Sequence, residues 1–318
     1  MDSPLVSIVI PCHNAEPWVA DAIKSALAQT YSPTEVLVVD DGSTDGSREI
    51  IRSFGEDIKF KFIDHHGAAH ARNRGMQMTS GEFIQFLDAD DILFPHCVTR
   101  KIEVALHENA DVVYSGSFFF NLEANAGTYE SHAPSENDLP SLVAHIIRSS
   151  LVTTILLCRR DRLTKLGGFN EELTNGQEHE LLLRLALTGA KFAYVSKALS
   201  CNRIRHNFDS ITSVTQRHPD RLEELFSRFE TMVKNADLWL PPVRAALGWR
   251  FHRAGVDFMA LHNRERAIAM FNKARVIEPD YIAELPLSRR LLVPIWGGYT
   301  AEKLLTKLRQ TAVRLGIG

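Results

Sequence analysis

Three acidic residues directly follow an apolar stretch of this chain. The stretch from Gly81 to Leu87 has the pattern of a buried strand, and Asp88, Asp90 and Asp91 come next. Two positions apart in extended chain, the side chains of Asp88 and Asp90 point the same way. Carboxylate oxygens at that spacing suit a Mg²⁺ or Mn²⁺ ion that carries a phosphate group. The alternative is a solvated strand end in which Asp91 caps the next helix.

The elements that must position these acids form a regular alternation in the first ninety residues. Strand-like runs cover residues 6–10, 36–39, 58–63 and 83–87, and helix-like stretches cover residues 15–29, 45–54 and 68–78. This alternation predicts an α/β fold with a mostly parallel sheet and helices on both faces. Right-handed crossovers bring the carboxyl ends of parallel strands to one edge, where ligands bind, so the polar residues after each strand should meet there.

The second strand ends in a polar segment that suits a nucleotide. Asp40 offers a carboxylate that could accept a hydrogen bond from a base N–H, and Gly42 lets the backbone approach a ligand. A strand–turn–helix junction with a good helix cap is the alternative interpretation. The chain has neither a Gly-x-Gly-x-x-Gly motif after the first strand nor a P-loop, which argues against dinucleotide redox enzymes and P-loop ATPases.

Four segments together resemble family-2 glycosyltransferases with the A-type fold. They are Val6 to Asn14, Val38 to Asp45, Ala71 to Gly75, and Phe86 to Asp91. The resemblance is looser over residues 167–181 and fades after about Thr212. It implies a Rossmann-like A-type glycosyltransferase fold, a nucleotide-sugar donor that is usually a UDP-sugar, a divalent metal (Mn²⁺ or Mg²⁺), and transfer with inversion at the anomeric carbon. Such enzymes are typical of cell-surface polysaccharide and glycan biosynthesis.

The resemblance assigns the nucleotide pocket to residues after the first two strands. Pro11 and Asn14 would line the pocket, Asp40 would meet the uracil, and Asp41 would lie beside it. His66, after the third strand, is a further candidate contact. An ordinary strand end is the alternative for this histidine.

The resemblance places the phosphates and the metal at the fourth strand. Arg72 would approach the diphosphate, Asp88 would lie near the ribose or sugar and share the metal, and Asp90 would ligate the metal whose charge stabilises the departing diphosphate. A surface cation on a helix is the alternative role for Arg72.

A later basic segment is similar to the family's Tyr-Arg-x-His…Ser segment, which folds over donor phosphates. It comprises Arg203 to His206 and Ser210 to Thr212, with Asn202 in place of the tyrosine. His206 is the third metal ligand that we expect. A basic segment of this kind suits a lid that excludes water. A solvated basic loop is the alternative.

An inverting transfer also needs a general base for the acceptor hydroxyl. Where the family commonly has Glu-Asp-x-Asp, this chain has Gln177-Glu178-His179-Glu180. The resemblance therefore assigns the base to Glu178, with Glu180 as the other candidate. Because a glutamate is one methylene longer than an aspartate, the acceptor would sit slightly farther away or the helix would begin farther back. A carboxylate that only stabilises the first helical turn is the alternative role for Glu178.

The composition is that of an ordinary globular protein of 318 residues, with 45% hydrophobic and 24% charged residues. The formal net charge of −3 gives no general attraction to nucleic acid. The four cysteines show no Cys-x-x-Cys spacing, which predicts reduced thiols. We find no signal-peptide pattern and no apolar run of about 18 residues. We therefore expect a cytoplasmic protein.

The chain should divide into a nucleotide-sugar-binding domain, residues 1–213, and a helical C-terminal region, residues 214–318. Residues 254–281 resemble one tetratricopeptide hairpin. From residue 286 on, six basic residues and one acid give a local charge of +5. Such an end could touch the inner face of a membrane that holds a lipid-linked acceptor, or it could only cover a core. Neither the transferred sugar, the acceptor nor the oligomeric state follows from the sequence.

Two other functions compete with a glycosyltransferase. The altered base motif and the helical hairpin would suit a degenerate family member that binds nucleotide-sugars or partner proteins without turnover, although Asp88 and Asp90 are intact. A nucleotidyltransferase would also need carboxylates and a metal. Those enzymes usually carry a glycine-rich, basic triphosphate loop near the amino terminus, and this chain has none.

Overall fold

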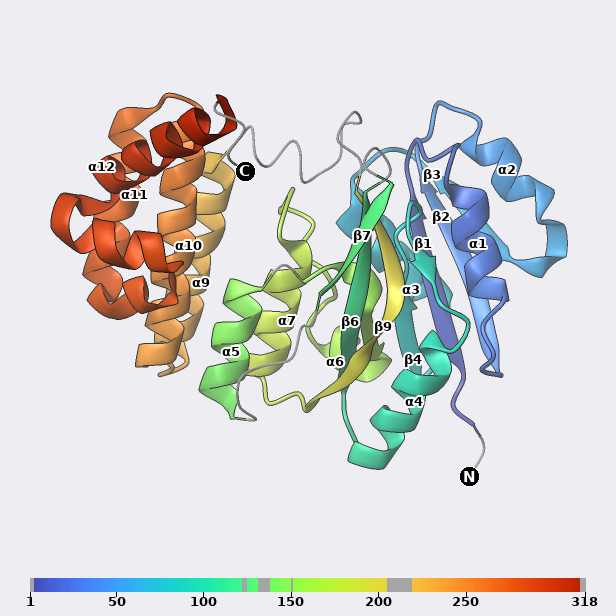
Figure 1. Cartoon of the computed structure of the whole chain (residues 1–318). Coiled ribbons are helices and arrows are strands. Elements are labelled where there is room, and N and C mark those ends of the chain that lie inside the picture. Colours follow the sequence, from blue (N-terminus) through green and yellow to red (C-terminus); the bar gives the residue numbers. More distant parts are fainter. Residues whose placement is uncertain (1–2, 122–124, 131–137, 150, 205–218, 315–318) are drawn as a thin grey trace. The chain divides into compact units, whose positions relative to one another are not determined.

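The computed structural model describes residues 3–121, 125–130, 138–149, 151–204 and 219–314 (Figure 1). The chain divides into two compact units. The first comprises residues 1–133 and 150–208, and the second comprises residues 134–149 and 209–318. Residues 134–149, which we expected in the first domain, group with the C-terminal helices. The end of this segment is bound by Arg250. Its guanidinium donates hydrogen bonds to the carbonyl oxygens of Ile147 at 2.5 Å and Ser149 at 2.8 Å.

The first unit is built on one twisted, mostly parallel sheet, as predicted. The strands are β1 (Val6–Cys12), β2 (Thr34–Asp41), β3 (Lys59–Ile63), β4 (Phe83–Phe86), β5 (Ile92–Leu93), β6 (Val112–Asn121), β7 (Ala126–Glu130), β8 (Leu156–Arg159) and β9 (Phe192–Ile204). Their order is β3-β2-β1-β4-β8-β6-β9-β5, with β7 paired to β6. Strands β3, β2, β1 and β4 run parallel, so their carboxyl ends share one edge.

Beyond the first ninety residues, apolar runs predict two further strands at residues 111–120 and 192–195, with a hairpin in the span up to residue 140. Two observed strands, β5 and β8, were not predicted, and β9 is longer than expected. β8 lies within an apolar run that lacks the alternation of a half-buried strand, and β5 has two residues. β9 was expected to end at Val195, but it continues to Ile204 because it pairs with β6 along its length, across two register shifts.

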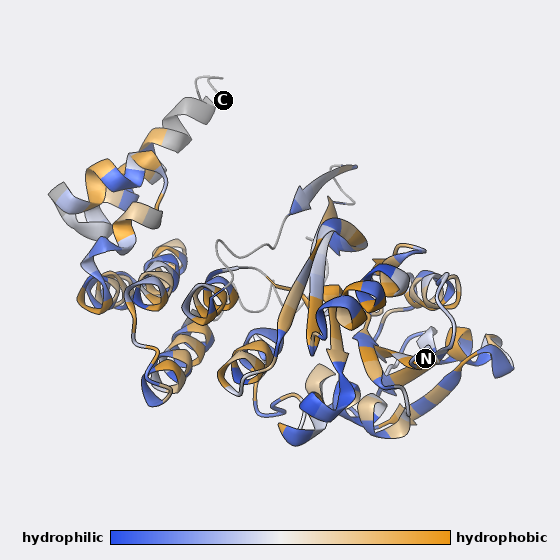
Figure 2. Cartoon of the chain, turned by 90° about the horizontal axis from the view of Figure 1, so that it is seen from below, coloured by the Kyte–Doolittle hydropathy of each residue, from blue (hydrophilic) through white to orange (hydrophobic). Residues whose placement is uncertain are grey.

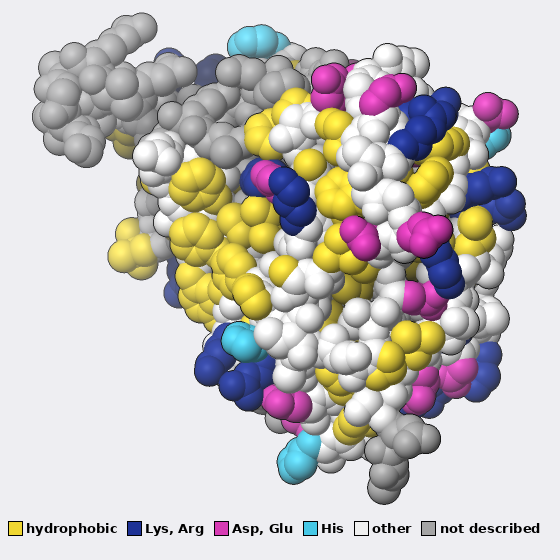
Figure 3. Space-filling view, turned by 90° about the vertical axis from the view of Figure 1, so that its right-hand side faces the viewer, with side chains coloured by type: hydrophobic (Ala, Val, Ile, Leu, Met, Phe, Trp, Pro, Cys, Tyr) yellow, Lys and Arg dark blue, Asp and Glu magenta, His cyan; other side chains and the backbone are white. Residues whose placement is uncertain are grey.

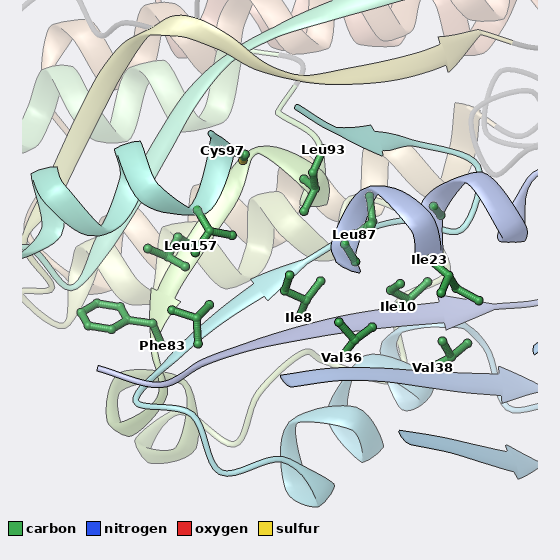
Figure 4. Close-up of a cluster of buried hydrophobic side chains, with 14 of the residues drawn as sticks. Ile8, Ile10, Ile23, Val36, Val38, Phe83, Leu87, Leu93, Cys97 and Leu157 are labelled. Atoms are coloured by element: carbon green, nitrogen blue, oxygen red, sulfur yellow. The ribbon is translucent and has the colours of Figure 1, made fainter. Parts of the chain in front are cut away.

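Helices cover both faces of the sheet, as the alternation predicted. The helices of this unit are α1 (Val19–Leu27), α2 (Ser47–Ser53), α3 (Ala68–Met78), α4 (Cys97–Glu108), α6 (Arg160–Lys165) and α7 (Gln177–Leu187). Val36 and Val38 of β2 pack in the core with Ile23 of α1 (Figure 4). The intervening Leu37 and Val39 pack with α3 on the opposite face. Alternate side chains of β2 therefore pack against helices on opposite faces of the sheet.

The loops after β1 and β2 are joined by hydrogen bonds at the carboxyl edge. The backbone N–H of Asn14 donates to Ser43 Oγ at 2.9 Å, and the side-chain oxygen of Asn14 accepts from the backbone N–H of Thr44 at 2.8 Å. Asn14 adopts a left-handed conformation with φ of 48°, which asparagine tolerates better than most residues. This pairing joins the two loops to each other.

The second unit consists of helices, as expected for the C-terminal region. They are α5 (Leu139–Arg148), α9 (Pro219–Asn235), α10 (Pro241–Ala260), α11 (Arg264–Ile277) and α12 (Leu287–Arg314), with a short 3₁₀ helix at Pro279–Glu284. Helix α12 is kinked at Gly297, where φ is 73°. Hydrophilic and hydrophobic residues alternate around the helices (Figure 2).

Surface charge is mixed on the side of the first unit that carries α1 and α2. Acidic and basic side chains are interspersed there (Figure 3), so this face presents no field of a single sign. None of the described helices combines the length and the hydrophobicity that a membrane span requires.

We predict that Gly75→Ala destabilises the protein although alanine is the better helix former. A Cβ at Gly75 would lie 2.3 Å from Val9 Cγ1 on β1, so α3 and the sheet would have to separate. We expect the free energy of unfolding to fall by about 1–3 kcal/mol, measured by urea denaturation. Gln77→Ala on the exposed side of α3 is the control, with an expected change within about 0.5 kcal/mol. A Gly75→Ala protein as stable as this control would contradict the prediction.

Candidate active site

The three acids after β4 differ in their surroundings. The Asp88 side chain is 28% exposed and Asp90 is half-buried, whereas Asp91 is buried. Asp91 caps no helix: its carboxylate accepts hydrogen bonds from Thr154 Oγ1 at 2.7 Å, from Asn202 Nδ2 and from the Arg203 backbone at 3.2 Å. Burial and the neighbouring charges of Asp90 and Asp88 raise the pKa of Asp91 well above its usual value. Asp91 therefore joins the acidic tip to the end of β9.

The carboxylates of Asp88 and Asp90 fit a hard divalent cation. They are partly accessible oxygen donors two residues apart, and negative charge is concentrated enough there to perturb Asp91. One oxygen of Asp88 is bound to Arg72, which leaves Oδ2 for an ion. His206, the third expected metal ligand, lies outside the described residues.

Arg72 connects the acidic tip to helix α7. Its side chain is 6% exposed, and its Nη2 donates to Asp88 Oδ1 at 2.6 Å. Nη1 donates to Gln177 Oε1 at 3.1 Å, and the guanidinium lies over the Phe169 ring at 5.4 Å. We expected Arg72 to approach the diphosphate. In the structure its buried side chain fixes the Asp88 carboxylate and the start of α7.

The neighbouring Asn73 holds the glycine turn before α7. Its side chain accepts a hydrogen bond from the Phe169 backbone N–H at 2.8 Å and donates to the Phe169 carbonyl at 2.9 Å. Gly168 has φ of 76°, and a Cβ there would lie 2.3 Å from Asn73 Oδ1. Only glycine fits this position, because the backbone is left-handed and the asparagine approaches closely. Helix α3 thus positions α7 through two consecutive side chains.

The two candidate bases on α7 have different environments. Glu178 is partly exposed, with its side chain 22% accessible, and its Oε1 lies 3.1 Å from His179 Nδ1. Burial opposes its ionisation, but the hydrogen bond and charge of His179 and the charge of Arg72 outweigh this, so the pKa of Glu178 is lowered. Glu178 is therefore a carboxylate at neutral pH with access to solvent.

Glu180, in contrast, is buried and committed to a structural ion pair. The Arg184 guanidinium contacts both of its oxygens, with distances of 2.8–3.0 Å. Arg184 also donates to the carbonyl oxygens of Leu166 and Gly168. Glu180 therefore supports the glycine turn, and its oxygens are not available to an acceptor hydroxyl.

The residues expected to bind the nucleotide lie along the β1 and β2 ends, but the two aspartates are buried. Asp40 Oδ2 accepts from Arg48 Nε at 2.6 Å and from the Ser43 backbone at 3.2 Å. Its Oδ1 has no hydrogen-bond partner among the described residues, although it is buried. Contact of Asp40 with a base would require the loop to move. Pro11 is buried, and Asn14 is exposed at the same edge.

Asp41 organises the loop after β3. Its two carboxylate oxygens accept from the backbone N–H groups of His66 and Gly67, both at 2.8 Å. Its backbone oxygen lies 2.7 Å from His13 Nδ1 and 3.0 Å from His65 Nδ1. The two imidazoles stack with their centroids 4.1 Å apart.

This stacked pair was not foreseen in the sequence. Ligand atoms of His13, Asp41 and His65 all lie within 4.8 Å of one another, so they form a second group that could hold a metal ion. Three polar side chains that position Arg72 or Asp91 were also missed. In the sequence, Gln177 stands out only as the first residue of the Gln-Glu-His-Glu motif, and Thr154 lies in an apolar run. Asn202 stands out only because it replaces the family's tyrosine. A polar residue inside an apolar run was the one available signal for Thr154.

The chain is similar in sequence to known glycosyltransferases. The family model described as Glycosyl transferase family 2 matches residues 7–166. An uncharacterized glycosyltransferase of Rickettsia conorii is 30% identical over 188 residues, which cover 57% of this chain and 31% of that protein. The Escherichia coli glucosyltransferase WfgD is 31% identical over 216 residues, which cover 67% of this chain and 81% of that protein.

The fold is also similar to that of a solved structure. Staphylococcus aureus TarS, residues 1–349, crystallised with UDP-GlcNAc, superposes with a TM-score of 0.70 at 19% identity. The match covers 98% of this chain and 92% of the TarS chain. At this identity the likeness confirms the A-type glycosyltransferase fold and its helical C-terminal region.

Proposed function

Because the chain belongs to glycosyl transferase family 2, we propose that it transfers a sugar from a UDP-sugar donor to an acceptor hydroxyl with inversion at the anomeric carbon. The support for the donor is that TarS was crystallised with UDP-GlcNAc and that WfgD is named for a UDP-Glc donor. The edge formed by β1, β2 and β4 carries the groups that such a donor needs.

The observation that carries the proposal is the bridge made by Arg72. Its guanidinium binds Asp88 of the acidic tip and Gln177, the residue before Glu178. One buried side chain therefore binds both the acidic tip, where the donor phosphates would lie, and the start of α7, which carries the proposed base Glu178. Inverting transfer requires the leaving group and the base on opposite faces of one sugar carbon, so the two groups must be held at a fixed separation, and the Arg72 bridge would help to fix it.

In this proposal, the loops after β1 and β2 bind the nucleotide. The buried Oδ1 of Asp40 lacks a donor, and an unsatisfied buried acceptor costs about 1–3 kcal/mol. A small movement of the loop would let the uracil N3–H supply that hydrogen bond. Pro11, Asn14 and Asp41 would then line the pocket around the base.

The phosphates would lie at the acidic tip. Asp88 and Asp90 would hold a Mn²⁺ or Mg²⁺ ion, which supplies positive charge for the departing diphosphate. Arg72 keeps the Asp88 carboxylate in place from behind. Glu178 accepts the proton of the acceptor hydroxyl as that oxygen forms the new glycosidic bond, and the UDP leaves from the opposite face.

The acceptor would be a glycan or a lipid-linked saccharide. WfgD is named for an acceptor attached to diphosphoundecaprenol, which would bring this protein to the inner face of the membrane. The cytoplasmic location and the peripheral contact are part of this proposal, as is a role in polysaccharide biosynthesis.

Replacing the base tests the catalytic assignment. Glu178→Gln should lower the rate of donor hydrolysis by roughly 10²- to 10⁴-fold, measured with a panel of nucleotide sugars and Mn²⁺. Glu180→Gln is the matched control. We expect it to retain most of the activity but to lose about 1–3 kcal/mol of stability, because Arg184 loses its charged partner. Full activity of Glu178→Gln would contradict the assignment, and UDP binding without any turnover in wild type would favour a degenerate family member.

Removal of the metal tests the acidic tip. Calorimetric titration of UDP should show binding in Mn²⁺ that weakens at least about tenfold in EDTA or in Asp90→Ala, because the phosphates lose their counter-charge. Glu82→Ala is the control, since Glu82 is an exposed acid at the opposite end of β4. Equal UDP affinity with and without the metal would exclude the expected role of Asp90.

The pH dependence tests the ionisation of Glu178. Because its folded pKa lies below the ordinary value of 4.5, the carboxylate stays deprotonated as the pH falls from 7 towards 5. We expect kcat/KM to show no acid limb from this group until the pH is below 4.5. His179→Asn removes the hydrogen-bonded imidazole and should move the limb to higher pH. A limb at the same pH in both proteins would contradict the assignment.

A further inference from the structure

The second unit carries a groove with a basic lining, formed by residues other than those of the candidate active site. Its volume is about 440 Å³, and it is formed by the end of α10, the start of α11 and the later part of α12. One wall is apolar, with Val256 and Met259 of α10. The other walls carry Arg264, Lys303 and Lys307.

The cations of this groove are arranged on two helices. Lys303 and Lys307 are four residues apart on α12 and therefore lie on the same face, where like charges repel each other. The Arg264 guanidinium lies over the Tyr299 ring at 5.5 Å, which limits its freedom. Within the described part of the chain, neither Arg264 nor Lys303 has a carboxylate at ion-pairing distance.

The one acid of the lining does not neutralise these cations. Glu302 is buried, and both of its oxygens are bound by Arg289, at 2.5 and 3.1 Å. His252 Nε2 lies 3.0 Å from the same carboxylate. The charge of Glu302 is thus compensated from inside the helical unit, and among the described residues Arg264 and Lys303 keep their positive charge in the groove.

We propose that this groove binds a phosphate-bearing ligand. Two ammonium groups and a guanidinium converge on a space within the range of small-molecule sites, roughly 300–1,000 Å³. Phosphate oxygens suit these donors because charge-assisted hydrogen bonds to phosphate are strong. The apolar wall on α10 and the Tyr299 ring would contact a less polar part of the ligand. A soluble phosphate compound and a lipid headgroup share this chemistry.

Inorganic diphosphate is the probe for the test, with the full chain in EDTA. Diphosphate should slow acetylation of the Lys303 and Lys307 amines, which peptide mass spectrometry reports site by site. This readout separates the groove from any diphosphate bound at the acidic tip of the first unit. Unchanged acetylation of both lysines up to millimolar diphosphate would overturn the proposal.

A charge-matched pair of variants completes the test. Lys303→Gln/Lys307→Gln should raise the Kd of this site about tenfold, because two exposed charge-assisted contacts each contribute a few-fold. Arg253→Gln/Arg275→Gln removes the same charge from exposed positions outside the groove and should leave the Kd unchanged. Circular dichroism melts check that both variants fold. Equal weakening by the two pairs would mean that net charge alone attracts diphosphate and would overturn the proposal.

Vesicle flotation distinguishes the source of the phosphate. Binding to phosphatidylglycerol vesicles but not to phosphatidylcholine vesicles, with competition by diphosphate, would support a lipid headgroup. Binding of diphosphate without any vesicle binding would support a soluble ligand. In either case the Lys303→Gln/Lys307→Gln protein should bind more weakly than wild type.

Discussion

The candidate active site of the first unit depends on a buried cation, the Arg72 guanidinium. A charge taken out of water is stable only with well-placed partners, and removing one partner of a buried pair typically costs about 3–5 kcal/mol. The partners of Arg72 come from Asp88, after β4, and from Gln177, at the start of α7. The helix that carries Glu178 therefore cannot shift relative to the acidic tip without leaving this charge uncompensated.

Asp91 imposes a second constraint on the same edge. It is the buried member of three neighbouring acids, and the strand β9 supplies two of its hydrogen-bond donors. The acids are thus placed close together against their mutual repulsion by contacts made behind them. If the proposed cation binds there, this concentration of negative charge would lower the reorganisation needed on binding.

Much of the first unit could be predicted from the sequence because its signals are local. Alternating apolar residues in β2 and helical stretches between strands predicted the parallel sheet, and polar residues after each strand predicted the edge. The partners of Asp91 could not be predicted in this way. Thr154 lies 63 residues away in the chain and Asn202 lies 111 residues away, so their contacts depend on the pairing of β8, β6 and β9. The hydrophobic periodicity within one strand does not predict which other strand it pairs with.

The choice between Glu178 and Glu180 also depends on contacts between residues that are distant in the sequence. In sequence both are acids in the first turn of one helix, where either would be stabilised by the helix dipole. Their positions two apart place them on different sides of α7. One side faces Arg184 and the glycine turn, which bury Glu180 and occupy its oxygens. The other side leaves Glu178 accessible, ionised and next to the residue that Arg72 binds. Burial, and not residue type, therefore separates a structural acid from a candidate base.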